Sequence, residues 1–383
     1  MTAAAGYFDH NATTPVDEAV LAAMLPYFRE KFGNASSRHE FGTVARKALD
    51  AAREQVAAVL AVHPSQVIFT SGGSEANNLF LRGAAGYLRP SQIVVSAVEH
   101  PCVARPAQEL ARQGWTLRKL AVDGEGRLDM ADLDAALREP AGIASVMLAN
   151  NETGVIHDVA AVAAKARARG ALAHTDAVQA FGKIPFDFPS LNVHALTLSG
   201  HKFYAPKGVG ALVMDKKLAL KSQILGGGHE SGLRAGTENV PAIVGFGLAC
   251  ELAAQRVAEL GPRLAALRQR LEQGLAGLGA TIFGRDAKRL PNTSFFAVPG
   301  IEGETLVIAL DQAGYACASG AACSSGASRV SAVLTAMGVP EELGRGAVRL
   351  SLGKDSTPAE VDGFLQALGR VLERLRGLAA VVT

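Results

Sequence analysis

Residues 172–202 read LAHTDAVQAFGKIPFDFPSLNVHALTLSGHK, and this stretch decides the fold. It contains two short apolar runs, 172–176 and 195–199, which predict two buried strands of one sheet. Similar runs and helical stretches precede it, with strands expected at 67–70, 93–96 and 144–148 and helices at 74–85 and 159–169. Short apolar strands that alternate with helices indicate an α/β fold, in which helices cover both faces of a mostly parallel sheet.

The C-terminal part of the chain predicts a second, smaller unit. Residues 238–278 have Ala and Leu at helical spacing and few breakers, so they predict a long helix that could connect two domains. Shorter strand and helix candidates follow at 293–296, 305–313, 348–351 and 358–376. We expect a large domain over 16–250 and a smaller α/β domain that joins 1–15 to 251–383.

Length, charge and hydropathy narrow the class of protein. The chain has 383 residues, 49% of them hydrophobic, which is enough for a large core and about two domains. Its 38 basic and 36 acidic residues leave a net charge of +2, which gives no reason to expect nucleic acid as a partner. The N-terminus lacks the pattern of a secretory signal, and no run of about 18 uncharged apolar residues predicts a membrane span. We expect a cytoplasmic protein.

The four cysteines, Cys102, Cys250, Cys317 and Cys323, form no CxxC pair. Their spacing is typical of free thiols in a reducing compartment, so we expect neither a disulfide framework nor a stably bound metal. Cys323 differs from Cys250 because it lies in a stretch of small and polar residues, ASGAACSSGA at 318–327. Such a stretch is typical of an accessible nucleophile, although a small residue in a tight turn is the alternative interpretation.

Polar residues follow the end of each predicted strand, where parallel sheets bind their ligands. They are Ser71 to Glu75, Glu99 and His100, Asn150 to Glu152, Asp176 with Gln179, and Ser199 to Lys202. Five polar strand ends predict one functional crevice. Within it, Gly72-Gly73-Ser74 either opens a helix whose free N–H groups bind a phosphate or is an ordinary turn with Ser74 as N-cap.

The ionisable residues of this crevice each allow a structural and a chemical interpretation. Lys202 is either solvated at the sheet edge or desolvated, in which case its neutral amine can form an imine. Asp176 either caps a loop or pairs with the ring nitrogen of pyridoxal phosphate, whose phenolic oxygen Gln179 could reach. His100 is either structural or stacked on a cofactor and able to move protons. An Asp followed 26 residues later by a Lys, each just past a strand, favours the cofactor.

Together these segments resemble the cysteine desulfurases, a class V aminotransferase group of the fold-type I pyridoxal-phosphate enzymes. The motifs that carry the resemblance are SGHK (199–202), TDAVQ (175–179), NNETG (150–154), TSGGSE (70–75), EH (99–100) and the Cys323 loop. The similarity extends from DHNATTP (9–15) to VRLSLG (348–353) and is to the nitrogen-fixation and housekeeping iron–sulfur branch. It implies a seven-stranded, mostly parallel sheet and a smaller domain that carries the catalytic loop at about 318–330.

The resemblance also implies roles for individual residues. Lys202, Cys323 and His100 are the catalytic residues, and Lys202 also binds pyridoxal 5'-phosphate as a Schiff base. The remaining cofactor-binding residues hold the ring (Asn151, Asp176, Gln179 and His100) or the phosphate (Gly73, Ser74, Ser199 and His201). Thr237 reaches the phosphate of a neighbouring subunit, which implies a homodimer. Asn34 and Arg349 bind the substrate carboxylate, a task suited to the fork of an arginine.

The implied reaction removes sulfur from L-cysteine. Cys323 takes the sulfur as a persulfide, alanine leaves, and the sulfur passes to a protein acceptor such as an iron–sulfur scaffold, for cluster assembly or tRNA thiolation. Through its persulfide, Cys323 could also be a transient iron–sulfur ligand. One departure concerns Ser328-Arg329-Val330, which stand where the branch usually has Leu-Glu-Pro and leave the acceptor open.

Three alternatives remain on the sequence alone. A selenocysteine lyase would keep the same residues, and a class V aminotransferase without persulfide chemistry would need Lys202 but not Cys323. A sulfur-binding or scaffold protein that kept the fold would need neither, and its lack of colour with pyridoxal phosphate would distinguish it.

Overall fold

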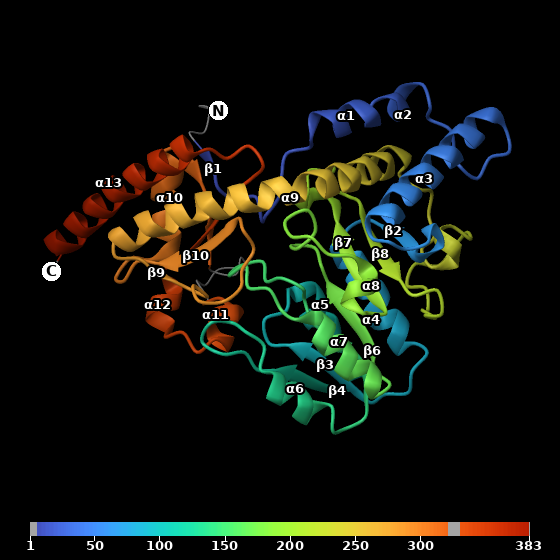
Figure 1. Ribbon diagram of the computed structural model, residues 1–383, viewed down its shortest axis with the longest axis horizontal. Coiled ribbons are helices and arrows are strands. Elements are labelled where there is room, and N and C mark those ends of the chain that lie inside the picture. Colours follow the sequence, from blue (N-terminus) through green and yellow to red (C-terminus); the bar gives the residue numbers. More distant parts are fainter. Residues whose placement is uncertain (1–5, 321–329, 383) are drawn as a thin grey trace.

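A seven-stranded sheet forms the centre of the larger part of the molecule, in a computed structural model that describes residues 6–320 and 330–382 (Figure 1). Its strand order is β2-β8-β7-β6-β5-β3-β4, and β8 runs antiparallel to both of its neighbours. The strands are β2 (Val67–Thr70), β3 (Gln92–Ser96), β4 (Thr116–Leu120), β5 (Ala141–Ser145), β6 (Leu172–Asp176), β7 (Ala195–Ser199) and β8 (Gly210–Met214). The predicted α/β class with a mostly parallel seven-stranded sheet is confirmed.

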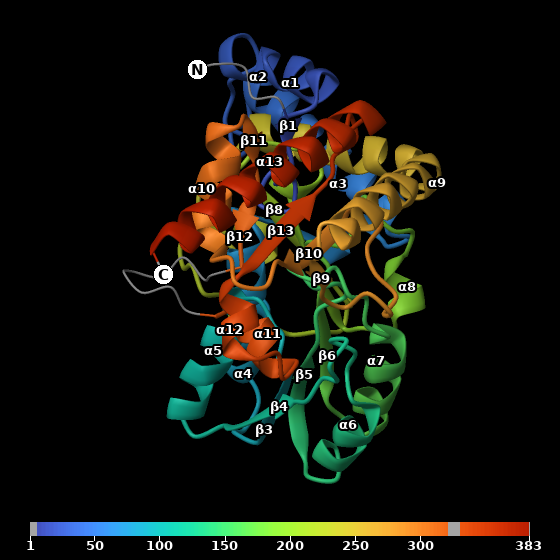
Figure 2. The ribbon, with the colours of Figure 1, turned by 90° about the vertical axis from the view of Figure 1, so that its left-hand side faces the viewer.

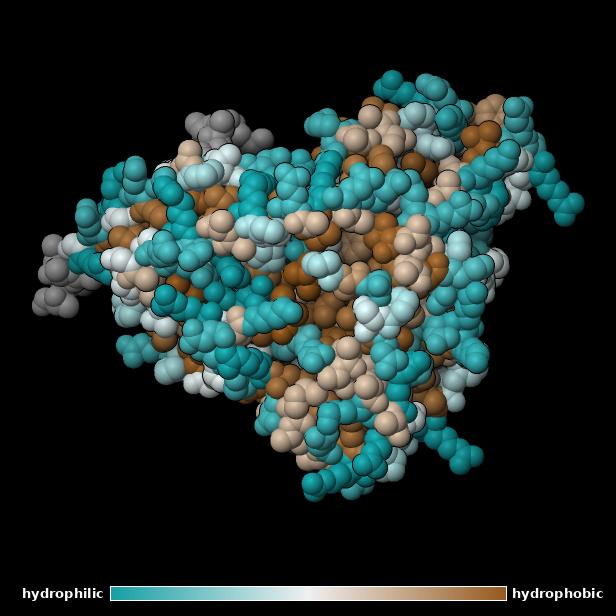
Figure 3. Space-filling model, in the orientation of Figure 1, coloured by the Kyte–Doolittle hydropathy of each residue, from teal (hydrophilic) through white to brown (hydrophobic). Residues whose placement is uncertain are grey.

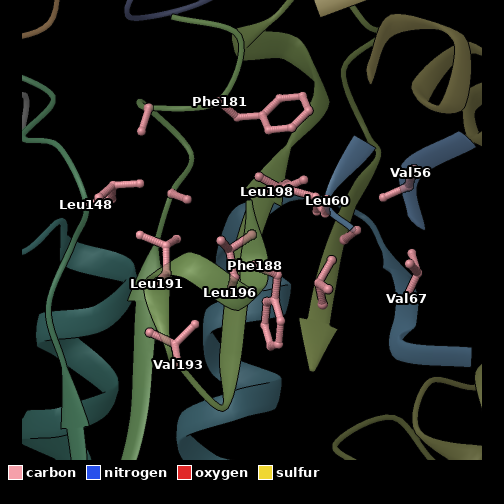
Figure 4. Close-up of a cluster of buried hydrophobic side chains, with 14 of the residues drawn as sticks. Val56, Leu60, Val67, Leu148, Phe181, Phe188, Leu191, Val193, Leu196 and Leu198 are labelled. Carbon is pink, nitrogen blue, oxygen red and sulfur yellow. The ribbon is translucent and has the colours of Figure 1, made fainter. Parts of the chain in front are cut away.

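Alternation of side chains along the buried strands separates two hydrophobic layers. Ile93 and Val95 pack on one face, beneath α4 (Gly73–Ala85) and α5 (Pro101–Arg112). Val94, Leu196 and Leu198 pack on the other face (Figure 4). That face is covered by α3 (Glu40–Val59), α6 (Met130–Ala136), α7 (Val159–Ala168), α8 (Phe188–Leu191) and the first half of α9 (Val240–Gly277).

Most predicted elements are confirmed, with shifts at their ends. The strand expected at 144–148 is β5 at Ala141–Ser145, and the chain beyond it still bonds to β6, because Leu148 N donates to Asp176 O at 2.9 Å. Helices α3 and α5 and strands β4 and β8 were not predicted from the sequence. The short helices α1 (Glu18–Met24) and α2 (Pro26–Arg29) lie along α9 at one edge of the molecule (Figure 1).

Helix α9 is 38 residues long and links two hydrophobic cores. Ile243, Phe246 and Cys250 in its first half belong to the core of the large sheet, whereas Leu267 and Leu271 belong to a second core. The helix is long and apolar enough to cross a membrane by length and composition, but half of its apolar window is buried inside the protein. Its apolar residues therefore have partners within the fold.

The second core lies on a four-stranded antiparallel sheet of order β12-β13-β10-β9. Its strands are β9 (Thr281–Ile282), β10 (Thr293–Ala297), β12 (Ala318–Ser319) and β13 (Ala347–Ser351), and β1 (Gly6–Tyr7) pairs nearby with β11 (Tyr315–Ala316). Its helices are α10 (Gly303–Gln312), α11 (Ala332–Ala336), α12 (Glu341–Arg345) and α13 (Pro358–Val382). Because Phe8 packs into this core, the N-terminal segment joins it, as the proposed division into 1–15 with 251–383 requires.

Helix α11 lies against the large sheet (Figure 2). Its Val333 and Leu334 share a hydrophobic cluster with Val98 and Met147, which follow strands of that sheet. Ser331, the N-cap of α11, also donates its hydroxyl to the partly buried carboxylate of Glu152. The chain on the C-terminal side of residues 321–329 is thus held beside the strand ends of the large sheet.

Candidate active site

A cavity of about 590 Å³ opens at the carboxyl ends of the parallel strands. Residues from the five strand ends that the sequence predicted line it, and β13 adds Arg349 from the second sheet. Ten predicted residues line the cavity together: Gly73, Ser74, His100, Asn151, Asp176, Gln179, Ser199, His201, Lys202 and Arg349.

Lys202 ends the short helix η2 (Gly200–Lys202), directly after β7. Its Nζ donates to the backbone oxygens of Asn11 at 2.7 Å and Ala12 at 2.8 Å. Burial, followed by the nearby charge of Arg349, lowers the pKa of the amine to about 8. About a tenth of an amine with such a pKa is neutral at pH 7, which makes it available to attack an aldehyde.

Asp176 is buried at the end of β6, and both of its oxygens are held in place. Oδ2 accepts from Asn77 Nδ2 at 2.7 Å, and Oδ1 accepts from Val178 N at 3.0 Å. Asn77 lies on α4 and is itself fully buried. Sequence analysis missed this residue, although its position on the helix that follows Gly73 was a signal that could have identified it.

His100 is the N-cap of α5, and its Nδ1 accepts from Cys102 N at 3.2 Å. Burial lowers the pKa of its ring, so the neutral imidazole is favoured at the cavity wall. Cys102 also lines the cavity, with Sγ 2.8 Å from His100 Nδ1. Burial and the charge of Asp176 raise the pKa of this thiol, which keeps it protonated.

The first turn of α4 offers a binding site for an anion. Its N-cap, Gly72, has a φ of +153°, and among the described residues no side chain caps the turn. A Cβ on Gly73 would lie 2.9 Å from Val178 Cγ2, so glycine lets the turn pack closely against Val178 while its backbone N–H groups remain available to an anion. Ser74, Ser199 and His201 line the cavity around this turn. The arrangement fits a phosphate group.

Arg349 extends from β13 into the cavity. Its Nη2 pairs with Asp9 Oδ1 at 2.7 Å, and its Nη1 donates to Asn151 O at 3.0 Å. Its buried Nε has no hydrogen-bond partner among residues 6–320 and 330–382, and such an orphaned donor could serve a substrate carboxylate. Asp9 is a second site residue that sequence analysis missed, although it begins one of the quoted motifs.

Two predicted residues of the described part of the chain, Asn34 and Thr237, do not line this cavity. Asn34 is exposed, and its Oδ1 accepts from Ser36 N at 2.8 Å within its own loop. Thr237 is exposed as well. A residue that reaches into a neighbouring subunit has to be exposed in the single chain. Cys323 lies outside the described residues. The assignment of all three stays a prediction.

Comparisons with known proteins agree with this geometry. The family model of the class V aminotransferases matches residues 6–364. The cysteine desulfurase of Rhodobacter capsulatus is 46% identical over 380 residues, which cover 98% of each chain. The chain belongs to the cysteine desulfurases of the class V aminotransferase family.

Solved structures extend the likeness of this desulfurase to the whole fold. A NifS-like protein superposes with a TM-score of 0.91 at 38% identity, covering 96% of this chain and 99% of the other. A structure described as SspA in complex with cysteine gives a TM-score of 0.81 at 30% identity and covers 92% and 100% of the two chains.

Desulfurases and class V aminotransferases use pyridoxal phosphate, and the cavity fits this cofactor. It combines a desolvated lysine, a fixed buried carboxylate and an uncapped helix start within one space. The resemblance named in the sequence analysis, the enzyme class and the cofactor are therefore confirmed.

Proposed function

We propose that this desulfurase removes sulfur from L-cysteine and stores it as a persulfide on Cys323. The observation that carries the proposal is the meeting of Lys202, Asp176 and Arg349 in one cavity. The segments that flank residues 321–329 are attached to Arg349 and to Glu152, the neighbour of the cavity residue Asn151. When bound, pyridoxal phosphate supplies an electron sink that acidifies the α-proton of an amino acid.

Each side chain has a task in this scheme. Lys202, with its lowered pKa, binds the cofactor aldehyde and later moves the α-proton of the substrate. Asp176, fixed by Asn77, holds the proton on the ring nitrogen. Gln179, His100 and Asn151 hold the ring, and the residues around α4 hold the phosphate: Gly73, Ser74, Ser199 and His201. Arg349 binds the substrate carboxylate, together with Asn34.

The attachment of both flanking segments supports the role of Cys323. On one side, Ala318 of β12 pairs with Arg349 of β13. On the other side, Ser331 bonds to Glu152, which follows the cavity residue Asn151. Cys323 is the fifth residue after Ala318, so an extended chain reaches at most about 18 Å from this strand. A thiol within that reach can serve a substrate bound at Arg349.

A homodimer completes the proposed site. Large apolar side chains are exposed on and near α1 and α2, and hydrophobic side chains are visible there in Figure 3. These are Leu21, Leu25, Phe28, Phe32 and Phe41, of which Phe32 is 66% exposed. Contiguous exposed apolar side chains indicate a protein interface. We propose that a second copy covers this face and that Thr237 reaches the partner's phosphate site.

The sulfur then passes from Cys323 to a protein acceptor in the cytoplasm, for which we propose an iron–sulfur scaffold. The division into a 16–250 domain and a domain of 1–15 with 251–383 allows the loop and the cofactor to belong to different units. The continuous α9 and its two cores support this division.

Mass spectrometry after turnover tests the proposal. The purified protein is incubated with cysteine, alkylated and digested, and one extra sulfur is expected on the peptide that contains Cys323. Cys323→Ala should lose sulfide release while retaining the absorption band of the bound cofactor. Unchanged sulfide release from Cys323→Ala would remove Cys323 from the reaction.

A further inference from the structure

Lys183 is a buried lysine next to the active site for which the proposed reaction has no role. It lies in the turns between β6 and α8, four residues after Gln179, and its side chain is 9% exposed. Its Nζ donates to Gln179 Oε1 at 2.6 Å and to Asn11 Oδ1 at 2.8 Å. Among the described residues, no carboxylate forms an ion pair with it.

These two bonds satisfy a neutral amine better than an ammonium group. A neutral amine has two N–H donors, and both acceptors here are amide oxygens, whereas an ammonium would bury a third donor and a charge. Burial and the nearby charges of Lys202 and Arg349 lower the pKa of Lys183 well below its usual value. Burying a lysine amine costs free energy, so its presence here points to a task for its hydrogen bonds.

The bonds of Gln179 to Lys183 and to Asn11 together decide which end of its amide faces the cavity. An amide carries a donor and an acceptor of almost equal size, so its orientation follows from its partners. The backbone oxygen of Asn11 can only accept, so the amide atom 2.9 Å from it is Nε2, and the atom that accepts from Lys183 is Oε1. The end of the Gln179 amide that faces the cavity is therefore Nε2, an N–H donor.

Asn11 joins the same network to Lys202. Its backbone oxygen accepts from both Gln179 Nε2 and Lys202 Nζ, and its Oδ1 accepts from Lys183 and from Asn292 Nδ2 at 3.1 Å. Asn11 is 1% exposed, and its own Nδ2 donates to Thr293 Oγ1 at 2.9 Å. Lys183 and Lys202 thus bind the same residue from two sides.

We propose that Lys183 is a positioning residue that orients the Gln179 amide, so that Nε2 donates to the acceptor oxygen of the bound cofactor ring. This inference rests on the cofactor site of the proposed function. Lys183 touches neither cofactor nor substrate in this scheme, and it acts through Gln179 and Asn11.

A double-mutant cycle tests the proposal on the full-length protein, with pyridoxal phosphate binding to the apoprotein as its main measurement. Lys183→Met removes both donors while filling a similar volume. We expect it to raise the Kd for pyridoxal phosphate about tenfold and to shift the absorption band of the bound cofactor, since one oriented hydrogen bond is lost. Gln179→Leu should have a similar effect.

The double variant decides the question. In the Gln179→Leu background, Lys183→Met should change neither the Kd nor the band further. Additive losses in the two backgrounds, or no loss from Lys183→Met alone, would overturn the positioning role. If Lys183→Met does not fold, Lys183→Leu replaces it in the same cycle and must meet the same conditions.

Two controls separate this outcome from other failures. Lys165→Met removes an exposed lysine that pairs only with Asp134, and it should leave the Kd unchanged. A wild-type protein that gains no band with pyridoxal phosphate would instead contradict the proposed function itself. A wild type that binds the cofactor but gives an additive cycle contradicts only the inference on Lys183.

Discussion

At the scale of a residue, burial sets the chemistry of the amine of Lys202. Its pKa of about 8 predicts that cofactor uptake by the apoprotein becomes about tenfold faster between pH 7 and pH 9, as the neutral fraction rises from about one tenth to about nine tenths. The rate should level off above pH 9. Stopped-flow absorbance at several pH values measures it, corrected for the titration of free pyridoxal phosphate.

An ordinary lysine would behave differently in the same experiment. With a pKa of about 10.4, its rate would still rise about sevenfold between pH 9 and pH 10. Such a continued rise would contradict the desolvated environment of Lys202. Lys202→Ala serves as the control and should form no covalent band.

A second prediction at this scale concerns Cys102, which lines the cavity but has a raised thiol pKa. Since the thiolate is the nucleophile, we expect Cys102 to react slowly with iodoacetamide at pH 7.5 and to carry no persulfide after turnover. Cys102→Ala should keep persulfide formation within about threefold of wild type, as expected for a small change in volume. Sulfur found on the Cys102 peptide would contradict this view.

At the scale of an element, the close packing of the first turn of α4 shapes the end of the cavity where we propose that the phosphate binds. Gly73→Ala places a Cβ 2.9 Å from Val178 Cγ2 and 3.3 Å from Ser199 Cβ. Packing strain of about 1–3 kcal/mol is partly offset by a gain of about 1 kcal/mol in helix propensity. We therefore expect a small change in the free energy of unfolding but an increase of about tenfold in the Kd for pyridoxal phosphate.

Gly277→Ala is the matched control for this substitution, since it lies in α9 and its Cβ would meet no atom within 4 Å. It should stabilise the protein by up to about 1 kcal/mol and leave the Kd unchanged. Urea unfolding and fluorescence titration provide the two measurements. Equal effects of both alanines on the Kd would show that the turn at Gly73 has no special part in binding.

At the scale of the whole molecule, a shared site predicts complementation between two inactive variants. Lys202→Ala and Thr237→Ala should each lose most desulfurase activity, because each homodimer then lacks one component in both of its sites. When the subunits are mixed and allowed to exchange, half of the dimers contain both variants, and each of these has one intact site. Activity should therefore recover to about a quarter of wild type.

The apolar face near α1 and α2 supplies the check on that experiment. Phe28→Asp with Phe32→Asp should weaken dimerisation, measured by sedimentation, and should abolish the recovered activity, because a charge in an apolar interface is costly. Recovery without dimers, or full activity in a monomer, would contradict a site built from two chains.

The sequence by itself determined the sheet strands that end at the cavity and most residues placed there. Hydrophobic periodicity is a local property, so 67–70, 172–176 and 195–199 coincide with β2, β6 and β7, and the polar residues after them follow automatically. Helix α3 was missed although its buried residues at 45, 48, 49, 52 and 56 recur at helical spacing, so its periodic signal was present in the sequence.

Only the tertiary structure decided which distant groups meet the residues of the site. Asp9 and Arg349 are 340 residues apart in the chain yet form an ion pair, and Asn11 accepts the amine of Lys202 from 191 residues away. The unusual pKa of Lys202 and the two amide partners of Lys183 likewise arise from packing. Such contacts depend on how the N-terminal segment and the two sheets come together around α9, and no local pattern of residues encodes that arrangement.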